Sequence, residues 1–191
     1  MRTKLFVSLP LDAFFFTELG RFIPDNTMMW KRVTPPHQLH LTALNLGVQE
    51  ESVIPHLQEL LGEITASMES FSLAFEGIGY GQQSPQDWRM LQATFKHSAQ
   101  FEALVFLLAR ACKPYRMEDS FAEEKIPHIT LAEDPTFDTS SIVPPLLSRL
   151  RGKSMKVTRL DLMESQRGLY RLSRRWEFIG RELALQARRS S

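Results

Sequence analysis

The sequence predicts an α+β fold made of two similar halves, each with an antiparallel sheet backed by helices. The triplet His-x-Thr occurs twice, in "QLHLTAL" (38–44) and "KIPHITL" (125–131), each time inside a short apolar stretch typical of a buried strand. Each stretch is close in sequence to a long segment with the helical hydrophobic period, at 51–68 and 101–111. We therefore expect a sheet and a helical layer in each half, with a groove between the halves.

The other elements follow from alternation, helical period and turn residues along the chain. Proline ends the opening strand at Pro10, Asp12 is suited to cap a helix, and two consecutive prolines exclude helix and ladder from 32–38. Gly47 is expected to close the first His-x-Thr strand. In order, we predict a strand at 4–9, a helix at 13–23, a loop at 32–38, a strand at 39–46, a helix at 51–68, paired strands at 71–75 and 88–95, a helix at 101–111, a strand at 126–131, and a closing hairpin of strands 157–163 and 170–179 turning at Gly168.

Length and composition predict one compact unit. A chain of 191 residues with 43% hydrophobic and 24% charged residues can bury a core as a single domain of two lobes, and we expect a monomer with a frayed tail at 181–191. Its net charge of +1 gives no global basic field for duplex DNA. The single cysteine, Cys112, excludes an internal disulfide and fits a small buried side chain. Asp12 interrupts the apolar N-terminal run, so we read no signal peptide and expect a cytoplasmic protein without a membrane span.

The two triplets have the residue types that phosphodiester chemistry needs. Residues i and i+2 of a strand share a face, so His40 and Thr42 share one face, as do His128 and Thr130. If the two sheets meet edge to edge, two imidazoles and two hydroxyls converge. An imidazole has an ordinary pKa near 6.5, so one ring can hold a proton while the other accepts one. A threonine hydroxyl can donate to a charged phosphate oxygen.

Other readings of these histidines remain. A single His-x-Thr is also typical of a half-buried histidine beside a β-forming residue. A zinc site would need further ligands, and the sequence has neither an "HExxH" motif nor a cysteine pair beside His37 and His40, so no metal or cofactor is expected. His56 and His97 fit surface or capping positions. Trp30 and 14–16 are assigned to the core.

At this level the chain resembles the 2H phosphoesterase superfamily, in its branch of RNA 2′,3′-cyclic phosphodiesterases, historically called 2′-5′ RNA ligases. The first motif "QLHLTALNLG" and the second motif "KIPHITLAED" carry the resemblance. The opening "KLFVSLPL", the central "SFSLAFEGIGYG" with "WRMLQATF", and the closing "VTRLDLMESQRGLYRLSRRWEF" support it, so it covers nearly the whole chain. The resemblance implies a bilobal fold with pseudo-two-fold symmetry and an active-site groove.

The resemblance also implies a function. It implies metal-independent opening of a terminal 2′,3′-cyclic phosphate of RNA to a 2′-phosphate, with 2′-5′ ligation as the reverse reaction. His40 and His128 would be the catalytic acid and base, and Thr42 and Thr130 the phosphate-binding residues. The family generally assigns the acid to the first histidine and the base to the second. Because the two triplets are chemically equivalent, the sequence leaves both assignments open.

One departure concerns the phosphate contact. Family members often have an arginine shortly after the second motif, where this chain has Glu133 and Asp134. Two carboxylates beside an anion site would repel the anion unless they point away. Lys125, Arg89 and Arg171 are candidate replacements for the missing cation, although each also fits a solvated surface charge. Tyr80, Trp88 and Tyr170 are candidate stacking residues for a base, although each also fits the core.

Three functional hypotheses are compatible with the sequence. The first is hydrolysis of the 2′,3′-cyclic end of RNA or of a small cyclic nucleotide. In the second, the same site acts on a 2′-5′ linked oligonucleotide or on a cyclic-phosphate derivative of ADP-ribose. Glu133 and Asp134, in place of the usual arginine, favour such a different substrate. The third is an RNA- or nucleotide-binding module without catalysis, and two titrating histidines argue against it because binding alone does not need them.

Overall fold

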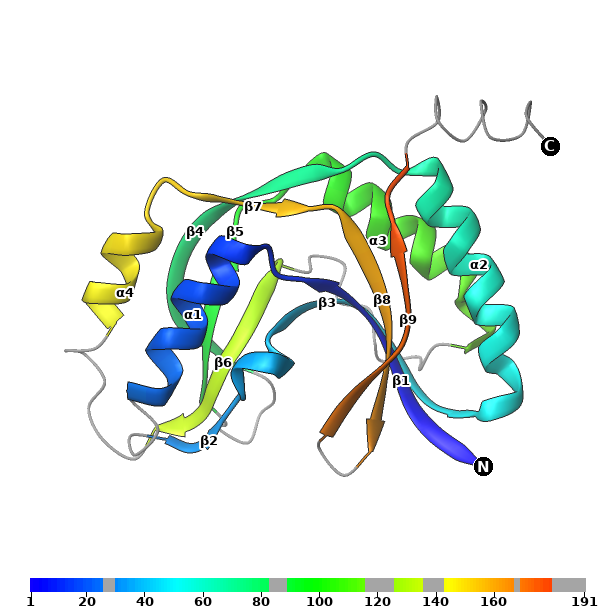
Figure 1. The fold of residues 1–191 in the computed structure, drawn as a ribbon, viewed down its shortest axis with the longest axis horizontal. Coiled ribbons are helices and arrows are strands. Elements are labelled where there is room, and N and C mark those ends of the chain that lie inside the picture. Colours follow the sequence, from blue (N-terminus) through cyan, green and yellow to red (C-terminus); the bar gives the residue numbers. More distant parts are fainter. Residues whose placement is uncertain (26–29, 83–88, 116–125, 136–142, 167–168, 180–191) are drawn as a thin grey trace.

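The computed structural model describes residues 1–191 except 26–29, 83–88, 116–125, 136–142, 167–168 and 180–191 (Figure 1). The described part is α+β, as predicted. The strands are β1 (Arg2–Pro10), β2 (Trp30–Val33), β3 (His40–Glu50), β4 (Phe71–Gln82), β5 (Arg89–Phe95), β6 (His128–Pro135), β7 (Ser154–Val157), β8 (Arg159–Gln166) and β9 (Leu169–Glu177). The α-helices are α1 (Ala13–Asp25), α2 (Ile54–Ser67), α3 (Ala99–Ala111) and α4 (Val143–Leu150). Short 3-10 turns are η2 (Pro36–Gln38), η3 (Glu51–Val53) and η4 (Lys113–Tyr115).

The described strands form one curled antiparallel sheet that consists of two half-sheets. The strand order is β7-β4-β5-β6-β3-β1-β8-β9, and β2 pairs with the C-terminal end of β6. The half-sheets join where β3 meets β6, at the residue pair Leu41 and Ile129. We call β3, β1, β8 and β9 with their helices the His40 half, and β6, β5, β4, β7 and β2 with their helices the His128 half.

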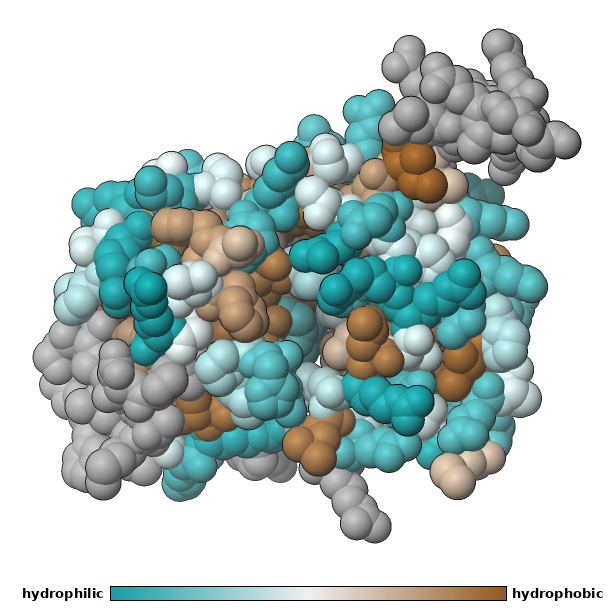
Figure 2. Space-filling view, in the orientation of Figure 1, coloured by the Kyte–Doolittle hydropathy of each residue, from teal (hydrophilic) through white to brown (hydrophobic). Residues whose placement is uncertain are grey.

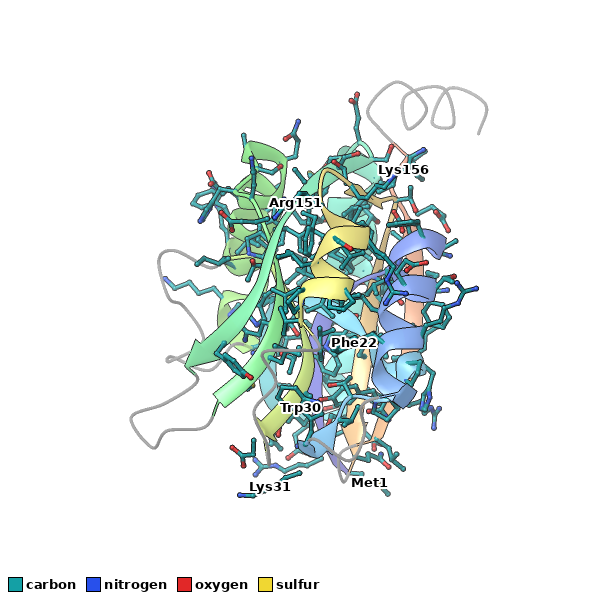
Figure 3. The ribbon with its side chains drawn as sticks, turned by 90° about the vertical axis from the view of Figure 1, so that its left-hand side faces the viewer. Met1, Phe22, Trp30, Lys31, Arg151 and Lys156 are labelled. Carbon is teal, nitrogen blue, oxygen red and sulfur yellow. The ribbon has the colours of Figure 1, made fainter. Side chains whose placement is uncertain are left out.

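Helices cover the outer face of each half-sheet. In Figure 1, α2 and α3 lie on the right beside the His40 half, and α1 and α4 lie on the left beside the His128 half. Phe15 of α1 contacts the rings of Phe75 and Phe95, which belong to β4 and β5. Figure 3 views this side, with α4 and α1 in front of the strands and the buried Phe22 and Trp30 labelled. The chain therefore crosses between the halves directly after β1.

Leucine side chains dominate the core between helices and sheet. Leu5, Leu9, Leu41 and Leu44 on the His40 half are almost completely excluded from solvent. This burial follows from the apolar alternation along the strands and explains why the helices pack on only one face of the sheet.

The structure corrects several expectations about element bounds. Gly47 does not close the first motif strand: β3 continues to Glu50, because Gly47 has a φ of 71° and lets the strand pass through a β-bulge. The expected helix at 51–68 begins with the 3-10 turn η3. Strands β2 and β7 were not predicted, since each has only four residues. Helix α4 lies between the second motif strand and the closing hairpin, where the sequence left helix or loop open.

The apolar run at 14–16 is only partly core. Phe15 is fully buried, whereas Phe14 and Phe16 are 40% and 47% exposed. A helix has 3.6 residues per turn, so three consecutive side chains cannot all face the same sheet. Figure 2 shows a hydrophobic area over α1 on an otherwise largely hydrophilic face. Trp30 is buried, as predicted.

Two expectations fall outside the described residues, namely the turn at Gly168 and the tail at 181–191. Within the described residues, no helix is both long and apolar enough to cross a lipid bilayer.

Candidate active site

The two His-x-Thr triplets lie on neighbouring strands at the junction of the half-sheets. Leu41 and Ile129, the central residues of the triplets, are antiparallel partners, and both side chains are fully buried on the helix side. Because side chains alternate along a strand, the histidines and threonines on either side of this pair face away from the helices. The antiparallel direction places His40 toward Thr130 and Thr42 toward His128. The pair is thus the centre of a local pseudo-two-fold arrangement.

A β-bulge follows each triplet. In β3 the partners of β1 step from Leu44 to Thr42 and leave Ala43 without a partner in that strand pair. In β6 the partners of β5 step from Ala132 to Thr130 and leave out Leu131. A bulge bends its strand and increases the local twist, which changes the direction of nearby side chains. The same irregularity at the same position of both motifs extends the pseudo-symmetry to the backbone.

Both imidazoles are held by the same kind of hydrogen bond. Nδ1 of His40 lies 2.7 Å from the carbonyl oxygen of Gln38, and Nδ1 of His128 lies 2.9 Å from the carbonyl oxygen of Ile126. A carbonyl oxygen only accepts, so Nδ1 is the donor in each ring and, in the neutral form, Nε2 carries the lone pair. Each ring is thereby oriented with Nε2 as the nitrogen that can accept a proton.

The backbone before each histidine supplies these acceptors. The 3-10 turn η2 places the carbonyl of Gln38 two residues before His40. In the second motif Pro127 is buried and accepts a hydrogen bond from the amide of Phe95. The prolines in "TPPHQ" and "KIPHI" therefore serve to fix the chain ahead of each histidine.

His40 lies in an aromatic environment. The Phe6 ring is 4.9 Å from the imidazole centroid, and the Tyr170 ring packs edge-on at 5.3 Å. The Nε2 atom of His40 is 3.1 Å from Oγ1 of Thr42. Tyr170 was a predicted stacking residue, and the structure places it beside the first histidine. Phe6 was not predicted as a site residue, because its apolar strand gave no sign of which face it occupies.

A cavity of about 500 Å³ extends from His40 along the His40 half. Strands β1, β8 and β9 form one side, and α1 with η2 forms the other. His128 is not among the described residues that line it. The lining residues are Ser8, Pro10, Leu11, Ala13, Phe16, His37, Gln38, Leu39, His40, Arg159, Asp161, Met163, Tyr170, Leu172 and Arg175.

A buried carboxylate pairs with an arginine in this cavity. Asp161 is 3% exposed, and its two oxygens accept hydrogen bonds from Nε and Nη2 of Arg175 at 2.7 and 2.6 Å. This ion pair raises the pKa of Arg175 above its ordinary value, mainly through the hydrogen bond to Asp161. Sequence reasoning missed the pair. The signal was Asp161 itself, a charge between buried leucines in "RLDLM".

The corresponding surface of the His128 half is flatter. Thr130 and His128 have Gln92 and Thr94 as their partners on β5, and these in turn have Gly79 and Gly77 as partners on β4. A Cβ atom added at Gly79 would meet no atom within 4 Å. The alternating glycines of "GIGYG" therefore leave this part of β4 without side chains on the face of the second motif.

The carboxylates after the second motif are paired with β2. Glu133 is the register partner of Arg32, and their side chains approach to 3.4 Å. Asp134 lies 3.7 Å from Nζ of Lys31. Glu133 and Asp134, whose negative charge would repel an anion beside Thr130, are thus each paired with a cation. Both cations belong to β2, a strand that was not predicted from the sequence.

The remaining candidate contacts are distributed differently. Tyr80 has the buried Leu91 as its partner and its ring is 6.4 Å from that of Trp30, so it lies on the helix-covered face rather than with the triplets. Arg171 does not line the cavity beside His40, but together with Leu169 and Tyr170 it lines a second hollow at the end of the β8–β9 hairpin. Trp88 and Lys125 lie outside the described residues. Of Arg89, only the backbone in β5 is described.

Other titratable residues lie away from the triplets. Cys112 is fully buried, and desolvation raises the pKa of its thiol to about 11, so it is a core residue, as predicted. His56 and His97 are on the surface, beside Glu59 and Glu102. Within the described residues, no three His, Cys, Asp or Glu side chains gather as a metal site requires.

Comparison with known proteins identifies the class. The model of the 2′-5′ RNA ligase superfamily matches residues 31–169, and the chain belongs to this superfamily of 2H phosphoesterases. The structure of TT0787 from Thermus thermophilus is similar, with a TM-score of 0.73 and 23% identity over 93% of this chain and 98% of that one. Apo LigT of E. coli has a TM-score of 0.65 and 23% identity, over 92% and 97%. No curated protein sequence matches the chain.

Proposed function

We propose that this phosphoesterase opens the terminal 2′,3′-cyclic phosphate of RNA to a 2′-phosphate, as a monomer and without a cofactor. The observation that carries the proposal is the pseudo-two-fold arrangement of His40, Thr42, His128 and Thr130 around the pair Leu41 and Ile129. Hydrolysis of a cyclic phosphodiester needs a base on one side of the phosphorus and an acid on the opposite side, and two oriented imidazoles meet that need.

The proposed reaction conserves its protons. One histidine accepts a proton from water at Nε2 as the water oxygen bonds to phosphorus. The other donates a proton from Nε2 to the 3′-oxygen as the bond between phosphorus and that oxygen breaks. The product is a 2′-phosphomonoester with a free 3′-hydroxyl, and each histidine ends in the protonation state with which the other began.

The neighbouring groups assist this transfer. The hydrogen bonds from Nδ1 to the carbonyls of Gln38 and Ile126 keep both neutral rings in the tautomer with Nε2 unprotonated. The hydroxyls of Thr42 and Thr130 donate to the non-bridging phosphate oxygens as charge builds on them. The same ring opening with a 5′-hydroxyl in place of water would form a 2′-5′ linkage.

Further support comes from charge and from a structural neighbour. The pairing of Glu133 with Arg32 and of Asp134 with Lys31 reduces the repulsion that these carboxylates would exert on a phosphate beside Thr130. LigT of E. coli has been crystallised with 3′-AMP, with phosphate and with ATP. Those ligands are known for LigT, and a similar fold around a nucleotide is compatible with our proposal.

The test is a single-turnover assay on an oligoribonucleotide that ends in a 2′,3′-cyclic phosphate, in excess EDTA, with identification of the product phosphate. We expect conversion to the 2′-phosphate with the metal chelated. A 3′-phosphate product would contradict the proposed direction of ring opening. A 2′-5′ linked oligonucleotide and a cyclic-phosphate ADP-ribose derivative, offered in the same assay, test the other substrates by kcat/KM.

A further inference from the structure

The cavity beside His40 contains charged residues that have no role in the proposed hydrolysis of a cyclic phosphate. It extends away from the second motif and includes two arginines, Arg159 and Arg175. We propose that this cavity binds the 5′-phosphate of the terminal nucleoside, either free or as the phosphodiester to the preceding nucleotide. The proposal rests on the proposed function, since it assumes that the cyclic phosphate lies at the two histidines.

Asp161 pairs with one edge of the Arg175 guanidinium and leaves other donors of that group for a ligand. Asp161 occupies Nε and one hydrogen of Nη2, so among the described contacts three of the five guanidinium N–H groups are left for a ligand. The carboxylate side chain is 5% exposed and the arginine side chain 40% exposed, so the pair is anchored at its buried end and open at its cavity end. A fixed, planar guanidinium is the group that best matches two phosphate oxygens.

The charge balance of the lining favours an anion. Arg159 and Arg175 contribute two positive charges and Asp161 one negative charge. Glu177 is the register partner of Arg159 and its charge also acts on Arg175, but it is not among the residues that line the cavity. The two arginines and the one aspartate of the lining therefore leave one positive charge in excess.

The rest of the lining suits a nucleoside. Leu11, Phe16, Met163 and Leu172 form apolar walls, and Tyr170 lines the cavity with its ring beside that of His40. A volume of about 500 Å³ is in the range of small-molecule sites. Phe16 is partly exposed and not a core residue, and contact of its ring with a bound ligand would explain this position. Cations beside apolar walls, in a cavity that begins at His40, define a specificity subsite.

The experiment compares three substrates that share one reacting end. They are adenosine 2′,3′-cyclic phosphate, its 5′-phosphorylated form, and the dinucleotide ApA ending in a 2′,3′-cyclic phosphate. We expect wild type to prefer the 5′-phosphorylated form over the unphosphorylated one by about tenfold in kcat/KM, mainly through KM, because charge-assisted hydrogen bonds hold the extra phosphate. If the dinucleotide is preferred over the unphosphorylated substrate as strongly as the 5′-phosphorylated form is, the site binds the phosphodiester of the RNA backbone. If the dinucleotide shows no such preference, the site binds a terminal phosphomonoester.

Arginine variants test whether the cavity causes the preference. Arg159→Gln, and Arg175→Gln combined with Asp161→Asn so that no buried charge is left unpaired, should reduce the ratio of the two kcat/KM values toward one. The ratio is taken within each variant, so that an effect common to both substrates cancels. The matched control is Arg174→Gln, which removes the same charge one residue away, where the side chain packs over Trp176 outside the cavity. Its ratio should equal that of wild type.

The outcomes separate the subsite from the reaction. A wild-type ratio near one, or a ratio that both cavity variants leave unchanged, would overturn the subsite while the phosphodiesterase stands. If none of the three compounds is hydrolysed, the proposed function fails, and the cavity is tested by equilibrium titration with 5′-AMP against adenosine. Stronger binding of 5′-AMP that Arg159→Gln abolishes would retain the anion site, and equal binding would overturn it.

Discussion

The two halves of the molecule contain the same motif in different surroundings. In each half a histidine is held through Nδ1 by the carbonyl two residues earlier, and a β-bulge follows the threonine. Beside His40, however, lie two aromatic rings and a cavity with an ion pair, whereas beside His128 lie Gln92, Thr94 and the glycine-rich strand β4.

Under the proposed function, this difference separates the catalytic groups from the groups that select the substrate. The repeated elements are the ones that a symmetric acid and base pair needs, and they are the same in both halves. The elements that differ are the ones that would contact the parts of a substrate beyond its phosphate. We infer that the pseudo-symmetry serves proton transfer and that the asymmetry decides how the substrate is oriented, hence which histidine faces water.

The largest expected effect tests the equivalence of the two histidines. His40→Ala and His128→Ala should each lower the single-turnover rate by about a thousandfold, because each removes one proton-transfer group. The double variant should be little slower than either single variant, since the two groups act as a unit. If either single variant keeps a rate within about tenfold of wild type, that histidine is not required and the two histidines are not equivalent.

The threonines should show a smaller but equally symmetric effect. Thr42→Val and Thr130→Val keep the side-chain shape and remove one hydroxyl donor. We expect each to lower kcat/KM by roughly ten- to a hundredfold, the size of one lost hydrogen bond to a charged group. Steady-state kinetics on the cyclic-phosphate substrate measures this. A large effect at one threonine and none at the other would show that only one half binds the phosphate.

The flat surface of the His128 half can be tested by filling it. Gly79→Ala should be neutral, because its Cβ would meet nothing within 4 Å, whereas Gly79→Leu should raise KM for an RNA substrate by about tenfold through steric exclusion. Thermal unfolding of both variants is the control for folding. An unchanged KM in Gly79→Leu would mean that the substrate does not lie over β4.

The smallest expected effect concerns Cys112, which belongs to neither motif. With a pKa raised to about 11, its thiol is protonated at neutral pH, and at pH 8 about one part in a thousand is thiolate. We expect no alkylation by iodoacetamide in the native state and full alkylation after unfolding. If alkylation of the native protein inactivated it, Cys112 would be a reactive nucleophile rather than a core residue.

The motif strands could be predicted from sequence because their signal is local. Apolar alternation around His40 and His128 gives both the strand and the shared face of each His-x-Thr. The α+β class followed from the neighbouring helical periods. Strand β2 could not be found, because four residues (Trp30–Val33) contain too few alternations to distinguish a strand from a loop.

What the sequence could not predict depends on pairing between distant residues. Tyr80 and Arg171 were plausible site residues, but only the structure shows that Tyr80 lies opposite Leu91 on the helix side and that Arg171 lines a second hollow rather than the cavity beside His40. Asp161 and Arg175 are 14 residues apart and meet only across the β8–β9 hairpin. A period of two fixes which residues share a face, and the register with the neighbouring strands fixes which face that is.

The measurement that tests the central account most directly is the pH dependence of kcat/KM in wild type and in the two histidine variants, under single-turnover conditions. One acid and one base predict a bell-shaped profile for wild type, of which His40→Ala loses one limb and His128→Ala loses the other. That result would also assign the acid and the base. If both limbs persist in either variant, or if both variants lose the same limb, the two histidines do not divide the proton transfers and the account is contradicted.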